Sequence, residues 1–133
     1  SQGEAEERAL EALSFVGLEE KKDMQAENLP IAQQKQLELA RAVASEPDLV
    51  LLDEIASGLT PGEIEELSNT IRRLRDELGI SVFWIEHIMD AIMGTADRII
   101  VLKSGEKIAE GTPEEIRNNQ VVTEAYLGEE DDS

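Results

Sequence analysis

The residues best able to do chemistry in this sequence are two adjacent carboxylates, Asp53 and Glu54, which follow directly on the aliphatic run from Leu49 to Leu52. A carboxylate at the end of a buried strand can hold a magnesium ion through bound waters, and a second carboxylate beside it can orient or deprotonate an attacking water. We therefore expect Asp53 to bind magnesium and Glu54 to act as the general base of a nucleotide hydrolase. The structural alternative is an acidic strand end that merely leaves the core.

The only histidine, His87, closes a second apolar run that begins at Val82. Because the carboxyl ends of parallel strands share one edge of a sheet, His87 could stand beside Asp53 and Glu54. There its imidazole could donate a hydrogen bond to charge developing on a γ-phosphate. A strand-end histidine without a catalytic role is the alternative.

A third candidate is the start of the helix expected after Pro30. The free backbone N–H groups and the dipole of a helix N-terminus attract anions, so Gln33 and its neighbouring amides could face a phosphate. A plain helix cap is the alternative. The sequence contains no G-x-x-x-x-G-K-[ST] loop, the segment that cradles phosphates in P-loop enzymes. We therefore interpret the chain as part of an enzyme.

Alternating helices and strands must position these residues. Helices are indicated by apolar spacing or by a capping box, and strands by short continuous apolar runs. A first helix is predicted at Ala5–Val16, with Ala9 and Leu13 on its apolar face, and a second from about Pro30 or Gln33 to Ser45, with a buried stripe of Leu37, Ala40 and Ala44. A third follows Thr60-Pro61 and has Ile64, Leu67, Ile71, Leu74 and Leu78 on one face. Shorter helices are predicted at about Met89 to Gly94, after the capping box Thr112-Pro113-Glu114-Glu115, and at Val121–Tyr126.

The strands are predicted at Leu49–Asp53, Ser81–Glu86, Ile99–Leu102 and Lys107–Ala109, with a hairpin turn at Ser104-Gly105. Leu49–Asp53 reads as a central parallel strand covered on both faces. We expect an α/β fold with a mostly parallel sheet, whose core is formed by the strands at Leu49, Val82 and Ile99.

Length and composition limit the remaining possibilities. The 133 residues suit one domain, which we place at residues 4–128, with residues 1–3 as an expression remnant and 129–133 as an acidic tail. The formal charge of −18 argues against binding to nucleic acid or to an anionic membrane. Acidic residues gather at both ends, where a solvated, partly frayed tail is expected: Glu4, Glu6, Glu7 and Glu11, then Glu129, Glu130, Asp131 and Asp132. No cysteine and no apolar run near 20 residues occur. We expect a cytoplasmic protein.

Taken together, the motifs resemble the ATPases of ABC transporters, from about Glu4 to Glu129. Gln33-Gln34 with Leu37 to Ala42 resembles the signature helix, Asp53-Glu54 the Walker B pair, Ser57 to Pro61 the D-loop, and His87 the switch histidine. Ile85-Glu86-His87 with Met89 and Met93-Gly94, then Ala109 to Asn119 and Ala125 to Gly128, resemble the branched-chain amino-acid uptake ATPases. Lipopolysaccharide-export ATPases share the ending less closely.

The resemblance implies a partial P-loop NTPase core, with residues 46–128 as its second half and residues 4–45 as the end of the helical subdomain. It implies ATP and magnesium as cofactors, with Leu29, Pro30, Ile31, Ala32, Gln33, Ser57 and Gly58 at the nucleotide. It also implies three partners: the half that carries the Walker A loop, a second ATPase subunit and a membrane permease. We expect the chain to begin after that loop and to show no turnover alone.

Three isoleucines stand where the family usually has other residues. Ile31 lies in Leu29 to Gln33, where Leu-Ser-Gly-Gly-Gln is usual; Ile55 replaces a proline, and Ile88 an aspartate. Ala32 also replaces a glycine, so phosphate contact should weaken. Ordinary drift is one explanation. The other is a non-catalytic, self-associating scaffold, engineered or degenerate, in which the isoleucines cover what a missing half would have covered.

Overall fold

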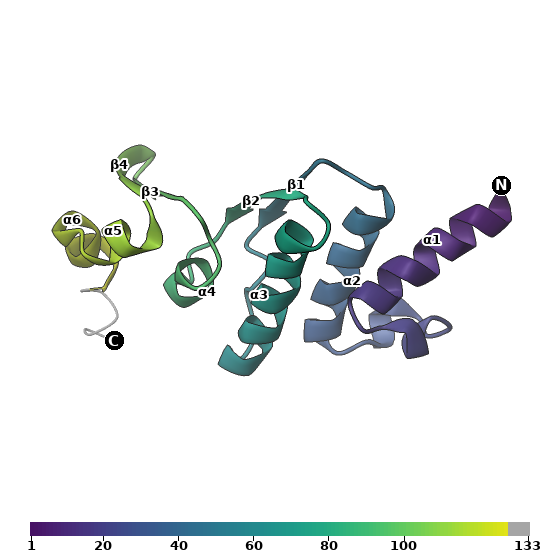
Figure 1. Cartoon of the computed structure of the whole chain (residues 1–133). Coiled ribbons are helices and arrows are strands. Elements are labelled where there is room, and N and C mark those ends of the chain that lie inside the picture. The colour runs from purple at the N-terminus through teal and green to yellow at the C-terminus, as the bar shows by residue number, and fades with distance from the viewer. Residues whose placement is uncertain (128–133) are drawn as a thin grey trace. The chain divides into compact units, whose positions relative to one another are not determined.

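The computed structural model describes residues 1–127 and divides the chain into two compact units, one ending at Ile88 and the other beginning at Met89 (Figure 1). The elements of the first unit are α1 (Gln2–Phe15), η1 (Glu19–Lys21), η2 (Ala26–Asn28), α2 (Ile31–Ala44), β1 (Leu49–Asp53), α3 (Pro61–Asp76) and β2 (Ser81–Ile85). Those of the second unit are α4 (Met89–Met93), β3 (Ile99–Lys103), β4 (Glu106–Gly111), α5 (Pro113–Arg117), α6 (Gln120–Val122) and η3 (Thr123–Leu127).

The single domain of residues 4–128 that we predicted, with its internal break at residue 45, stays a prediction. The strands pair within each unit. Over the described residues β1 pairs with β2 in one sheet and β3 pairs with β4 in another, so the expected common sheet of the strands at Leu49, Val82 and Ile99 is wrong. The hydrogen bonds of the hairpin satisfy the facing edges of β3 and β4.

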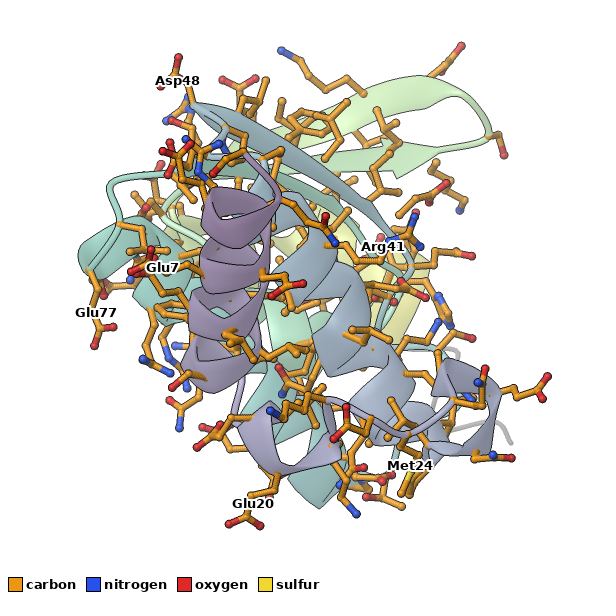
Figure 2. The ribbon with its side chains drawn as sticks, turned by 90° about the vertical axis from the view of Figure 1, so that its right-hand side faces the viewer. Glu7, Glu20, Met24, Arg41, Asp48 and Glu77 are labelled. Carbon is orange, nitrogen blue, oxygen red and sulfur yellow. The ribbon has the colours of Figure 1, made fainter. Side chains whose placement is uncertain are left out.

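Helix α1 is ordered from its first turn. Ser1 caps it, and the Ser1 hydroxyl accepts a hydrogen bond from the Glu4 backbone N–H at 3.3 Å, so residues set aside as an expression remnant take part in the helix. Figure 2 shows α1 lying along α2 with acidic side chains such as Glu7 on the surface. The acidic residues of this end are exposed, as a solvated end predicts, and the capping box satisfies the helix start. The other acidic run lies outside the described residues.

The buried face of α1 also differs from the predicted one. Ala12 is buried and Phe15 packs against the core, while Ala5 and Ala9 are exposed. The first two turns of α1 carry no large apolar residue before Leu10, so the helix is held mainly through its C-terminal half.

Helices α2 and α3 supply the main apolar contacts of the first unit. In α2 the buried residues are Leu39 and Ala40, whereas Leu37 and Ala44 of the predicted stripe are only partly buried. In α3 the predicted stripe is confirmed at Leu67, Ile71 and Leu74. Thr60 and Glu63 form a capping box at its start. Leu78 is exposed because α3 ends at Asp76, before it.

The parallel β1–β2 sheet is covered on one face only. Val50 pairs in register with Val82 and Leu52 with Trp84, and these residues face the core formed with α2 and α3, which lie below the strands in Figure 1. The alternate residues Leu49, Leu51, Phe83 and Ile85 are exposed, Leu51 to 71%. The prediction of a strand covered on both faces is therefore wrong for the described residues. A continuous apolar run shows that a strand suits two-sided burial, not that this chain supplies both layers.

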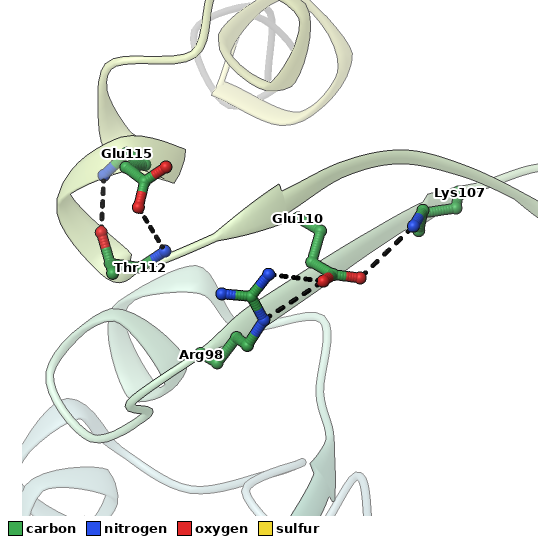
Figure 3. A network of polar contacts seen from close by, with 5 residues as sticks. All are labelled: Arg98, Lys107, Glu110, Thr112 and Glu115. Carbon is green, nitrogen blue, oxygen red and sulfur yellow. Dashed lines mark hydrogen bonds and ion pairs between the residues drawn. The ribbon is translucent and has the colours of Figure 1, made fainter.

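In the second unit, β3 and β4 form the predicted hairpin. Ser104 and Gly105 both have positive φ, at 51° and 80°, as a two-residue hairpin turn requires. Ile99, Val101, Ile116 and Val122 form its core. The predicted capping box of α5 is confirmed, with the Thr112 hydroxyl accepting from the Glu115 N–H at 3.2 Å (Figure 3). Within residues 1–127, no helix has the length and apolarity needed to cross a bilayer.

Arg98, Lys107 and Glu110 form a surface ion-pair network on this hairpin (Figure 3). The hydrogen bond from Arg98 to Glu110, at 3.1 Å from Nε, lowers the pKa of the Glu110 carboxyl, and Lys107 lowers it further. The same hydrogen bond raises the pKa of Arg98. The network is exposed, so its effect on stability is small.

We expect Glu110→Gln to change the pH dependence of unfolding of the second unit. Because the Glu110 pKa is lowered on folding, its stabilisation is complete above the ordinary value of 4.5 and is lost as the pH falls through the lowered pKa. The wild type should therefore lose its small advantage over Glu110→Gln as the pH falls below 4.5 and through the lowered pKa of Glu110. Denaturant titrations followed by the NMR signals of Tyr126, the only tyrosine, measure this. Glu106→Gln, on the same strand but outside the network, is the control and should leave the acid slope unchanged.

Candidate functional site

The carboxyl ends of β1 and β2 lie at the same edge of the sheet. Asp53 pairs in register with Ile85, and the backbone N–H of Glu54 donates a hydrogen bond to the Ile85 carbonyl at 2.7 Å. Glu54 itself has a φ of 52°, a left-handed conformation that costs a non-glycine residue free energy. The chain therefore turns sharply after Asp53 and brings Glu54 beside the residues that follow β2.

This turn places Glu54 next to His87. The Glu54 Oε1 atom lies 3.3 Å from His87 Nδ1, and both side chains are open to solvent, at 55% and 62%. Sequence reasoning anticipated this juxtaposition from the shared strand edge. With Nδ1 turned toward a carboxylate, Nε2 is the ring nitrogen left for a ligand. The catalytic roles of the two residues stay predictions.

The Asp53 side chain lies on a different face from the Glu54–His87 pair. It continues the alternation of β1, so it belongs to the uncovered face of the sheet together with Leu51, and it is exposed. A carboxylate at such an exposed strand end is free to bind a hydrated cation. The structure thus puts both carboxylates at one edge of the sheet, with Asp53 at the end of β1 and Glu54 at the start of the turn that follows.

Sequence reasoning missed Glu86. Its side chain has no exposed surface, although it lies between the exposed residues Ile85 and His87. Its carboxylate accepts hydrogen bonds from the backbone N–H of Ala56 at 3.2 Å and of His87 at 3.1 Å. One signal could have found it: Glu86 follows Val82 and Trp84 in the inward alternation of β2, where a carboxylate needs partners.

The segment after Glu54 forms a compact turn that the start of α2 touches. The Ser57 N–H donates to the Glu54 carbonyl at 3.2 Å, and Gly58 has a φ of 83°, which favours glycine. A Cβ at Gly58 would lie 3.8 Å from Ile31 Cδ1. Ile31 therefore packs toward the turn that holds Ser57 and Gly58, and the two predicted nucleotide-contacting segments are neighbours within this unit.

The residues around the start of α2 take different positions. Leu29 is buried, and its backbone carbonyl accepts a hydrogen bond from Gln34 Nε2 at 3.0 Å; its expected place at the nucleotide stays a prediction. Pro30 is the N-cap of α2, and its side chain accepts no hydrogen bond from the first backbone N–H groups of the helix. Ala32 is helical and partly buried, so a glycine is not required there for backbone conformation.

Gln33 does not present its amide oxygen to solvent. Gln33 Oε1 is buried and has no hydrogen-bond partner within the described part of the chain. A buried carbonyl oxygen requires a donor, such as an N–H or a hydroxyl group. An amide oxygen only accepts hydrogen bonds, so any donation from Gln33 to a phosphate oxygen would come from its side-chain NH2 or its backbone N–H, and its expected role stays a prediction.

The arrangement fits a magnesium nucleotide only in part. Over residues 1–127 no group of three or more His, Cys, Asp or Glu side chains could hold a metal ion by itself. Magnesium, however, is commonly bound through one or two carboxylates, waters and the substrate's phosphates, which Asp53 and Glu54 could satisfy. The sequence has no glycine-rich phosphate loop to supply the main phosphate contacts.

Comparison with known proteins decides the family. Residues 2–57 match the model of the family described as "ABC transporter", and residues 106–132 match "Branched-chain amino acid ATP-binding cassette transporter". The high-affinity branched-chain amino acid transport ATP-binding protein LivG of Salmonella typhimurium is 46% identical over 97% of this chain and 51% of its own length. The chain belongs to the ABC-transporter ATPase family. BraF of Pseudomonas aeruginosa, a protein of the same description, is 43% identical over the same share of both chains.

A solved ABC ATPase cassette has the same fold. The ADP conformation of MJ1267, an ATP-binding cassette of an ABC transporter, superposes with a TM-score of 0.85 at 30% identity, over 94% of this chain and 50% of that one. The predicted family and the predicted α/β class with a parallel sheet are confirmed. The chain spans about half the length of the curated relatives that it matches.

Proposed function

We propose that this chain carries part of the ATP-hydrolysing site of an ABC importer for branched-chain amino acids. In this proposal Glu54 is the general base, Asp53 binds magnesium through water, and His87 contacts the γ-phosphate. The observation that supports it most directly is the 3.3 Å approach of Glu54 Oε1 to His87 Nδ1 at the carboxyl edge of a parallel sheet. The named activity of the LivG and BraF relatives supplies the substrate class.

The roles of the residues follow from their chemistry. Glu54 accepts hydrogen bonds from an attacking water and takes its proton, and its open side chain leaves room for that water. A His87 ring with a proton on each nitrogen donates from Nδ1 toward Glu54 and from Nε2 toward a phosphate oxygen. Bound magnesium ATP would supply the reactive phosphate and the charge neutralisation that these residues alone do not.

The site needs partners to become complete. We propose that a polypeptide with the Walker A loop joins this chain, that two such ATPase subunits work together, and that they dock on a membrane permease at its cytoplasmic side. The reason is the missing phosphate loop: without it, most of the binding energy for the triphosphate is lacking. The purified chain alone should therefore show no turnover, and calorimetry with magnesium ATP should show no saturable binding at millimolar concentration.

Reassembly tests this proposal. We expect the chain, combined with the first half of Salmonella LivG, to hydrolyse ATP, and Glu54→Gln to lower kcat by about 10²–10⁴-fold through loss of the base. Glu65→Gln, a glutamate on the exposed face of α3, is the matched control and should keep full activity. Hydrolysis that survives Glu54→Gln, or no hydrolysis by a complex shown to be assembled, would contradict the proposal.

A second candidate function is a non-catalytic, self-associating scaffold of engineered or degenerate origin. The uncovered apolar face of β1–β2, with Leu49, Leu51, Phe83 and Ile85, favours it, since exposed apolar patches of this kind mark interaction surfaces. It predicts a defined homo-oligomer by light scattering. Polydisperse aggregate would count against it.

A further inference from the structure

Glu86 is a buried carboxylate whose two oxygens have different partners. Oε2 accepts from the Ala56 backbone N–H at 3.2 Å, whereas Oε1 accepts from the His87 backbone N–H at 3.1 Å and lies 3.4 Å from His87 Nδ1. The side chain has no exposed surface. Burying a carboxylate is costly unless several donors face it, so this arrangement reflects a specific set of contacts and not an incidental position.

These contacts join the two segments that carry the proposed reaction. Ala56 belongs to the turn that follows Glu54, and His87 follows the end of β2. At this edge, beyond the strands, the Glu54 N–H also donates a hydrogen bond to the Ile85 carbonyl. Glu86 therefore provides a second connection between the two segments. It hydrogen-bonds to the turn after Glu54, whose φ is positive, and to the residue that follows β2.

The same carboxylate also constrains the imidazole ring. His87 Nδ1 lies within 3.4 Å of an oxygen of Glu86 and 3.3 Å of an oxygen of Glu54. Carboxylate oxygens accept hydrogen bonds, so a nitrogen placed between two of them is favoured as N–H. In the neutral ring this places the proton on Nδ1 and directs Nε2 away from both acids; Nε2 donates to a phosphate oxygen when the ring carries a second proton.

We propose that Glu86 is a positioning residue, which holds the turn 54–57 against the end of β2 and keeps the Nδ1 side of His87 toward the carboxylates. Glu54 and His87 Nε2 are then presented together to one ligand. The meaning for catalysis rests on the proposed function. The positioning itself is a property of this chain and is measured without nucleotide.

The test uses nitrogen-15 NMR on the 133-residue chain, in which His87 gives the only imidazole signals. In the wild type we expect Nδ1 to carry the proton of the neutral ring and the amides of Ala56 and His87 to exchange slowly with solvent. In Glu86→Gln the charge is lost at constant length. The two amides should then exchange about tenfold faster or more, as expected for losing a hydrogen bond to a charged group, and the share of ring protonated at Nδ1 should fall.

Control variants separate positioning from general stability. Glu54→Gln removes the other carboxylate at Nδ1 and should alter the ring signals but leave the Ala56 amide protected. Glu65→Gln should alter neither. The fluorescence of Trp84, the only tryptophan, reports whether each variant remains folded.

The results that would overturn the proposal are equally specific. A wild-type neutral ring protonated at Nε2 would overturn it without any variant, even if every Glu86 variant failed to fold. A folded Glu86→Gln protein with unchanged Ala56 and His87 exchange and unchanged ring signals would also overturn it. Inactivity of the reassembled LivG complex would instead contradict only the proposed function, because these NMR signals do not depend on turnover.

Discussion

Replacing Leu52 with alanine is expected to lower the free energy of unfolding of the first unit by about 2–5 kcal/mol. Leu52 is 8% exposed and packs from the covered face of β1 into the core formed by α2 and α3. Truncation removes apolar contacts and leaves a cavity that close-packed neighbours fill only in part. Since small domains are stable by only about 5–15 kcal/mol, the loss is a large share of the total.

Leu51 is the matched control, because it is the same residue type, one position away, on the uncovered face. Leu51→Ala should change the free energy of unfolding by about 0.5 kcal/mol or less. Denaturant unfolding followed by Trp84 fluorescence, at low protein concentration, compares the two variants. Equal losses at Leu51 and Leu52 would mean that something covers the outer face in solution, and would favour the self-associating scaffold.

Ile55→Ala is the second variant with a large expected effect, again about 2–5 kcal/mol. Ile55 was expected on a nucleotide-facing surface, where the family usually has proline. The structure places it at 2% exposure in the core of the first unit, together with Leu52 and Leu67. The turn after Glu54 directs this side chain inward, so Ile55 is a core residue and not a covering for a vacant site.

Ile31→Ala supplies the comparison for Ile55→Ala. Ile31 is 51% exposed and lies near the Gly58 turn, so its loss should cost about 1 kcal/mol or less. Ile88 packs partly buried against the same core as Ile55 and should fall between the two. If all three isoleucines could be truncated without loss of stability by Trp84 fluorescence, a structural role for these substitutions would be ruled out.

Local features of the fold were predictable from the sequence because they depend on neighbouring residues in the chain. The capping boxes at Thr60 and Thr112 and the hairpin turn at Ser104-Gly105 follow from side-chain and backbone chemistry within a few residues. The apolar spacing of α3 likewise identified Leu67, Ile71 and Leu74 as core. The buried faces of α1 and α2 were harder to predict, because more than one face of each helix carries apolar residues. The segments that pack against these helices determine which face is buried.

The candidate site was predictable in part for the same reason. Asp53, Glu54 and His87 were found because each ends an apolar run, and parallel strands bring such ends together. Leu29 and Gln33 were expected at the nucleotide; the structure buries Leu29 and the amide oxygen of Gln33, which their positions in the sequence do not indicate. Glu86 was missed because a glutamate beside a histidine is ordinary in a sequence, and only its burial sets it apart.

By itself, then, the sequence determined the family, the order of helices and strands, and the strand edge where Glu54 and His87 meet, since motifs and periodicity encode short-range structure. Tertiary structure alone decided that β3 does not join the sheet of β1 and β2, and that one face of that sheet is uncovered over the described residues. It also decided that the Glu86 side chain points inward, to the backbone N–H groups of Ala56 and His87. The physical reason is that burial and hydrogen-bond partnership depend on which distant segments are present to pack, and no local pattern records their presence.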